Sequence, residues 1–218
     1  MKKGILSSLC VIIVSIVTTS AMANSTIVVQ SGAYQNGVGG EFTATLGGDA
    51  LNGLTDGVFQ TFCMEYNEHI SFGTTYTIEL NTAAVLGGVG GGSPDPLDAR
   101  TAWLYNEFLN GTLASYDYTG ANRHYCAGQL QNAIWYLENE IPRVNSGSLA
   151  EQFVQRAEAA GWDSIQNVRV LNLYDTHGNF CQDVLCRVNV VPAPGALLLT
   201  CLGIAPLKWL RRRQLGLS

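Results

Sequence analysis

Charged residues are scarce in this chain. They make up 13% of its 218 residues, whereas glycine alone occurs 24 times. The formal net charge is −5, and no run of lysine and arginine occurs in the middle of the chain. A nucleic-acid-binding surface requires such a cluster of basic residues. We therefore expect no nucleic-acid partner. Cytosolic enzymes usually carry more charge, so the composition favours a secreted domain that contains β-structure.

Signatures of catalysis and of metal binding are also missing. The three histidines stand in no Cys-His hydrolase signature. His124 and Cys126 lack the second ligand pair of a zinc site, and the glycine-rich residues 87–93 lack the Lys-Ser/Thr of a phosphate loop. Glu65 and Glu68 are expected to be solvated at a strand end. We therefore predict no enzyme, no cofactor and no metal.

The N-terminal residues 1–23 have the three parts of a secretory signal. Lys2 and Lys3 precede a short apolar run over residues 5–17. Residues 21–23 read Ala-Met-Ala, which is an A-x-A cleavage site. We expect cleavage between Ala23 and Asn24. An uncleaved N-terminal anchor is the alternative.

The C-terminal residues 191–214 have a second composite pattern. A proline motif comes first, an apolar segment over residues 196–210 follows, and an arginine cluster closes it. The apolar segment is shorter than the 20 or so residues that usually cross a bilayer, and the arginines should stay cytoplasmic. The motif consists of Pro192, Ala193 and Pro194, and the cluster of Arg211, Arg212 and Arg213.

This tail resembles the PEP-CTERM sorting signal of Gram-negative envelope proteins, with Ala193 in place of the usual glutamate. The resemblance implies transfer through the secretion machinery and removal of the tail by an exosortase-type protease. The chain would be held in the membrane through its tail, at least transiently, and then reach the cell surface or the extracellular matrix. A permanent C-terminal anchor is the alternative.

Residues 24–190 should form one α+β domain. Alternating and β-branched segments predict strands near both ends, and apolar residues at helical spacing predict three helices between them. Ser148 and Glu151 form a capping box before the third helix, and Asp95 with Pro96 should start the first. The expected strands are residues 25–30, 41–46, 58–66, 74–80, 168–174 and 184–190, and the expected helices 96–109, 120–140 and 148–160.

Two short motifs carry the most specific information. Phe62-Cys63 lies in a predicted strand, and Gln131-Asn132-Ala133-Ile134-Trp135 lies in the second predicted helix. Together they resemble the thioester domain of bacterial surface adhesins. The resemblance implies that the Cys63 thiol attacks the Gln131 side-chain amide, releases ammonia and forms an internal thioester. Gln131 and Trp135 are four residues apart and share a helix face, so Trp135 could shield the bond from water.

Disulfides compete with this chemistry, because thiols pair in oxidising compartments. Cys181 and Cys186 are close in sequence and make the first expected pair. Cys63 and Cys126 remain, and a disulfide between them would exclude the thioester. The sequence therefore leaves two functions open. One is attachment to an amine-bearing partner through a thioester, and the other is a disulfide-stabilised structural protein of the envelope or biofilm matrix.

Overall fold

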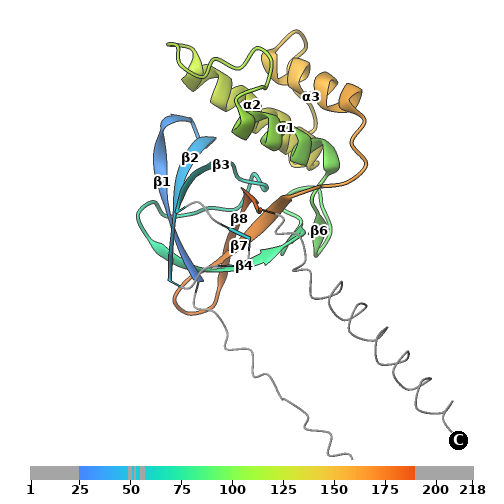
Figure 1. Cartoon of the computed structure of the whole chain (residues 1–218). Coiled ribbons are helices and arrows are strands. Elements are labelled where there is room, and N and C mark those ends of the chain that lie inside the picture. Colours follow the sequence, from blue (N-terminus) through green and yellow to red (C-terminus); the bar gives the residue numbers. More distant parts are fainter. Residues whose placement is uncertain (1–24, 49–50, 52, 55–56, 190–218) are drawn as a thin grey trace, which may run out of the picture.

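The computed structural model describes residues 25–48, 51, 53–54 and 57–189. The predicted signal, with Ala23 and Asn24, and the predicted sorting tail lie outside the described residues. Within the described part, no helix is both long and apolar enough to cross a membrane. The described residues form one curved antiparallel sheet with three helices packed over one side of it (Figure 1).

The main sheet has six strands in the order β3-β2-β1-β4-β7-β8, and each neighbouring pair is antiparallel. A second, two-stranded sheet pairs β5 with β6. The α+β prediction, with antiparallel strands at both ends and three central helices, is confirmed. The strands are β1 (Ser25–Asn36), β2 (Gly39–Gly48), β3 (Val58–Thr61), β4 (Thr75–Asn81), β5 (Ala83–Ala84), β6 (Asp95–Pro96), β7 (Val168–Tyr174) and β8 (Phe180–Arg187).

The two edges of the main sheet meet directly after β3. Cys63 forms an isolated antiparallel bridge with Val184 of β8. The main chain is joined on both sides of this bridge, with 3.0 Å from the Met64 nitrogen to the Asp183 oxygen and 3.1 Å from the Leu185 nitrogen to the Phe62 oxygen. The sheet therefore curls until its edges touch, and we call residues 62–64 the seam.

The helices are α1 (Ala99–Asn110), α2 (Arg123–Leu137) and α3 (Leu149–Ala160). The predicted cap of α3 is confirmed, because the Ser148 side chain accepts a hydrogen bond from the Glu151 nitrogen. The predicted start of α1 is wrong. Asp98 caps that helix, and Asp95 with Pro96 instead forms β6 against β5. The carboxylate of Asp98 satisfies a main-chain N–H that the first turn leaves without a partner.

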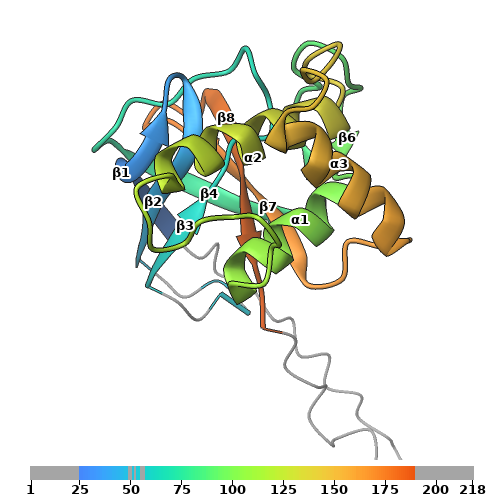
Figure 2. The same ribbon diagram turned by 90° about the horizontal axis from the view of Figure 1, so that it is seen from above.

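Two apolar cores result from this arrangement. One lies inside the curled sheet and includes Ile27, Phe42, Leu173 and Val184. The other lies between the sheet and the helices, where α2 crosses β1 and β2 and also packs against α3 (Figure 2). Because the seam residues contribute to both cores, Phe62 and Met64 face the helices and Cys63 faces the interior of the sheet.

Candidate functional site

Cys63 is the central residue of the seam. Phe62 and Met64 make the main-chain hydrogen bonds to β8, so Cys63 is the non-hydrogen-bonded member of the bridge. In antiparallel pairing, the N–H and C=O of such a residue point away from the partner strand. These two groups therefore face α2, and they are buried, since Cys63 is only 4% exposed.

The Gln131 side chain of α2 fills this position. Its Nε2 donates to the Cys63 carbonyl oxygen at 2.8 Å, and its Oε1 accepts from the Cys63 nitrogen at 3.2 Å. Gln131 is fully buried. The two residues that the motifs single out, 68 positions apart in sequence, are thus in direct contact. The contact joins the Gln131 amide to the main chain of Cys63, whose side chain belongs to the core inside the sheet.

The amide oxygen of Gln131 has a second donor. The Gly40 nitrogen lies 3.5 Å from Oε1, so two main-chain N–H groups point at the oxygen that would gain negative charge when a nucleophile adds to the amide carbon. This is the arrangement of an oxyanion hole, although the Gly40 contact is long. Gly39, in the same β1–β2 hairpin, brings the main chain close to the site. A Cβ on Gly39 would lie 2.4 Å from Gln131 Cγ and 2.6 Å from Trp135 Cη2.

Trp135 covers the site one turn further along α2. Its indole is 5% exposed, and the Tyr66 ring packs edge-to-face on it at a centroid distance of 4.9 Å. The indole Nε1 is buried and has no hydrogen-bond partner among the described residues. The sequence-based prediction that Gln131 and Trp135 share one face is confirmed by this packing. The aromatic pair and the hairpin separate the Cys63–Gln131 contact from solvent.

Burial controls the chemistry of the thiol. Loss of hydration raises the pKa of Cys63 to about 12; a hydrogen bond from Gln182 partly opposes this rise, and the nearby carboxyl groups of Glu65, Glu68 and Asp183 add to it. The thiol is therefore protonated at neutral pH. Reaction with the amide requires that the thiol proton leave during the attack, because the thiolate is the nucleophile.

Three carboxyl groups gather beside the seam. Oxygens of Glu65, Glu68 and Asp183 lie within 4.8 Å of one another, which is the donor type that a hard cation prefers. The prediction that Glu65 is solvated is wrong. It is 2% exposed, and its Oε2 has no hydrogen-bond partner among the described residues. Burial, followed by the charges of Asp183 and Glu68, raises the pKa of Glu65 to about 11.

The predicted disulfides are not formed. All four cysteines of the described residues are free thiols. Cys181 and Cys186 both lie in β8, and five residues of extended strand span roughly 16 Å, far beyond the roughly 7 Å limit for bridged Cα atoms. Because both cysteines lie on the same extended strand, their Cα atoms are too far apart for a disulfide.

Cys63 and Cys126 do not pair either. Cys126 lies in the core between sheet and helices, where its Sγ accepts from the Asp117 nitrogen at 3.4 Å. Cys126 is five residues before Gln131 on α2, so the two side chains point about 140° apart around the helix. The helix that brings Gln131 to the seam therefore turns Cys126 away from it.

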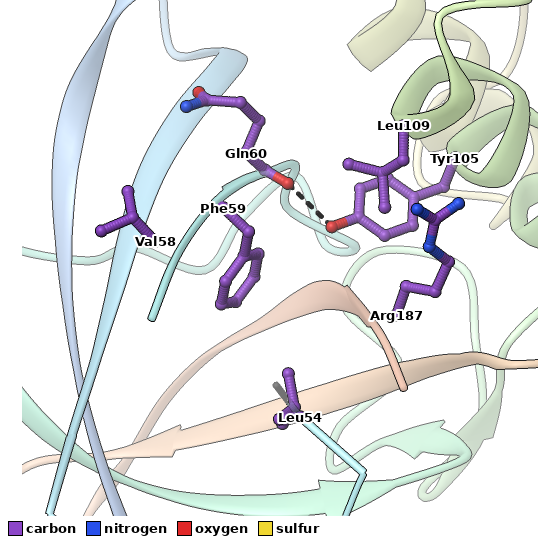
Figure 3. Close-up of a pocket in the computed structure, with 7 residues that line it drawn as sticks. All are labelled: Leu54, Val58, Phe59, Gln60, Tyr105, Leu109 and Arg187. Atoms are coloured by element: carbon purple, nitrogen blue, oxygen red, sulfur yellow. Dashed lines mark hydrogen bonds between the residues drawn. The ribbon is translucent and has the colours of Figure 1, made fainter. Parts of the chain in front are cut away.

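A cavity of about 200 Å³ lies elsewhere, between β3 and α1 (Figure 3). The Tyr105 hydroxyl closes one side of it by donating to the Gln60 carbonyl oxygen at 2.7 Å. Arg187 forms another side and donates to Asn106 and Asn110. None of its lining residues belongs to either sequence motif. The cavity is lined by Leu54, Val58, Phe59, Gln60, Tyr105, Leu109 and Arg187.

Comparisons with protein-family models, with curated proteins and with solved structures found no match to this chain. The site therefore rests on its own geometry. The motifs predicted Cys63, Gln131 and Trp135. They did not predict Gly40, which stands at the β1–β2 hairpin, or Asp183, which reaches the seam through strand pairing across the chain.

Proposed function

We propose that this protein is an exported surface or matrix protein that attaches itself covalently to a partner through an internal thioester between Cys63 and Gln131. One observation carries the proposal. The Gln131 amide is held at the main chain of Cys63, with its oxygen facing two N–H donors. This arrangement positions the acyl carbon and stabilises the oxygen on which charge develops.

The first step is intramolecular acyl transfer. The Cys63 sulfur adds to the Gln131 carbonyl carbon, the carbon–nitrogen bond breaks, and the thiol proton leaves with the amide nitrogen as ammonia. The surrounding aromatic pair limits hydrolysis of the product.

The second step is capture of a partner. An amine of the partner attacks the same carbonyl carbon, an amide bond forms, and Cys63 leaves as a thiol that regains a proton. Each molecule reacts once and is consumed, so the protein is not an enzyme. Export by the signal at residues 1–23, and sorting by an exosortase-type protease that acts on residues 191–214, would deliver it to the cell surface.

Intact-mass spectrometry of the exported protein tests the first step. The protein should be about 17 Da lighter than its sequence predicts, because ammonia is lost. The deficit should be absent in Cys63→Ala and retained in Cys126→Ala, a matched buried cysteine that does not contact Gln131. A mass that equals that of the mature sequence, with four titratable thiols, would contradict the thioester.

The second candidate is a structural envelope protein with no covalent chemistry. It is favoured by the same hydrogen bonds, because Gln131 satisfies two buried main-chain groups that otherwise lack partners. The protonated, buried thiol agrees with this alternative. Under this alternative, Gln131→Glu should weaken folding. The mass of the wild-type protein should be explained by its sequence alone.

A further inference from the structure

Lysine is absent from the whole predicted domain. The chain has three lysines, Lys2 and Lys3 in the predicted signal and Lys208 in the predicted tail, and none at any position from 4 to 207. Lysine is among the commonest residues of soluble domains. All six basic residues of the domain are arginines, and the guanidinium stays protonated and does not act as an amine nucleophile.

The remaining side chains are poor substitutes for an amine. Cys126 and Cys186 are buried. Cys181 is partly exposed, but burial and the charge of Asp175 raise the pKa of its thiol, and a thioester to it would be exchanged by any added thiol. Apart from its α-amino group, the domain therefore offers no amine to its own electrophile or to that of a second copy.

The charge of the domain points the same way. The predicted domain at residues 24–190 contains all 17 acidic residues and six arginines, which gives it a formal net charge of −11. Among the residues that the structure describes, five acidic side chains are buried, and the other twelve acidic residues of the sequence still outnumber the six arginines two to one. Copies of the domain repel one another, whereas a basic surface is attracted and encounters the domain faster.

We infer that the acyl acceptor is a lysine on a basic partner protein, and that the domain carries no side-chain amine through which it could couple to copies of itself. The inference rests on the proposed thioester. Its products are therefore single attachments, one domain to one partner lysine, and not polymers of this chain. Lysine-free sequence and excess acidic charge act together, because the first removes the competing nucleophile and the second selects the intended one.

Arg143 provides the test of self-exclusion. It is exposed and lines the same surface hollow as Tyr66, whose ring packs on Trp135, so Arg143→Lys places an amine close to the shielded bond without changing the charge. The full chain is exported, purified and incubated at high concentration. Mass spectrometry first establishes the ammonia loss and both mature ends.

The wild type should stay monomeric on denaturing gels. Arg143→Lys should form covalent multimers or an internal cross-link through position 143, and Arg143→Lys in the Cys63→Ala background should form neither. Multimers of the wild type that survive thiol treatment would overturn the inference. Wild-type multimers that form without any loss of ammonia would instead count against the thioester, so the two failures are distinguishable.

Partner charge is tested with two peptides of equal length that each carry one lysine, flanked by arginines in one and by glutamates in the other. At low salt the basic peptide should couple at least about tenfold faster, and the difference should shrink at high salt, because steering by charge is screened. Equal rates at low salt would contradict a basic partner. Cadaverine, which has no flanking residues, should couple at an intermediate rate.

Discussion

At the scale of single residues, the site depends on one property of antiparallel pairing. Cys63 bridges Val184 without main-chain hydrogen bonds, so its N–H and C=O need partners from another element. Gln131 supplies both with one amide. A shorter side chain, such as asparagine, would not reach from α2, and a carboxylate could not donate to the carbonyl. The requirement for glutamine is therefore structural before it is chemical.

Gly39 allows this contact and gives the residue-scale prediction. In Gly39→Ala the new methyl group would meet Gln131 Cγ and Trp135 Cη2 at distances that real side chains do not tolerate. We expect displacement of the Gln131 amide, a loss of about 1–3 kcal/mol of stability from overpacking, and at least a tenfold lower fraction of molecules that have lost ammonia. Urea unfolding and intact-mass spectrometry measure the two effects.

Gly57→Ala is the matched control, because a Cβ there would meet nothing within 4 Å. It should leave both stability and mass deficit unchanged. If Gly39→Ala instead kept the full ammonia loss, Gln131 could move without losing its reactivity. The proposal that the Gly40 N–H of the hairpin stabilises the amide oxygen would then be wrong.

At the scale of elements, α2 must be held at a fixed position over the hairpin for Gln131 to reach the seam. A buried ion pair holds its first turn. Arg123 donates to Glu41 of β2 through Nη2 at 2.6 Å and through Nε at 3.1 Å, and the Tyr116 hydroxyl donates to the same carboxylate at 3.0 Å. Glu41 is 1% exposed, so the negative charge of its carboxylate is compensated by Arg123 and not by solvent.

Removing one partner of this pair should cost more than removing both. Arg123→Met leaves an uncompensated buried carboxylate and should lower the free energy of unfolding by about 3 kcal/mol. The double variant Arg123→Met with Glu41→Gln should recover at least half of that loss. Chemical denaturation of the four proteins completes the double-mutant cycle. Strictly additive losses would mean that the ion pair does not act as a unit.

The sequence predicted these elements unevenly, for physical reasons. Helices are encoded by local patterns, namely apolar spacing and caps such as Ser148 and Gly161. The sequence therefore placed all three helices to within a few residues. The last strand was expected at residues 184–190 but begins at Phe180. That shift put both Cys181 and Cys186 inside one strand and made their predicted disulfide impossible.

The site itself was half predictable. Cys63 and Gln131 stand in motifs, whereas Asp183 and Gly40 reach the seam only through sheet closure and a hairpin, which no local pattern encodes. Glu65 was expected in solvent because a carboxylate is rarely buried without a partner. Its burial is a consequence of closing the sheet edges at residues 62–64, which holds Glu65 against β8, where Gln182 Nε2 donates to its carbonyl oxygen at 3.2 Å.

At the scale of the whole molecule, buried acids dominate the response to pH. Burial is the main cause that raises the pKa of Glu65 to about 11, of Glu68 and Glu138 to about 8, and of Asp183 to about 7. No lysine or arginine forms a salt bridge with any of these four among the described residues. The folded protein therefore keeps protons that the unfolded chain releases once the pH exceeds about 4.5.

The sign follows from this difference in bound protons. Above about pH 4.5 the folded state binds more protons than the unfolded state, so its stability falls as the pH rises. The decrease should be steepest between about pH 5 and pH 7, because all four groups then contribute. It should continue more gently above pH 8, where Glu65 alone still holds its proton. A single group contributes at most about 1.4 kcal/mol per pH unit.

Urea midpoints at pH 5, 7 and 9, measured with a chelator present, test this prediction. The wild type should be most stable at pH 5. Glu65→Gln should flatten the dependence, because a neutral amide replaces the proton-holding acid, and Glu158→Gln, at an exposed position of α3, should follow the wild type. Stability that rises from pH 5 to pH 9 would show instead that the carboxylates are ionised and compensated in the folded protein. Repeating the series without chelator then identifies the compensation, because a cation shared by Glu65, Glu68 and Asp183 would restore stability only at the higher pH values.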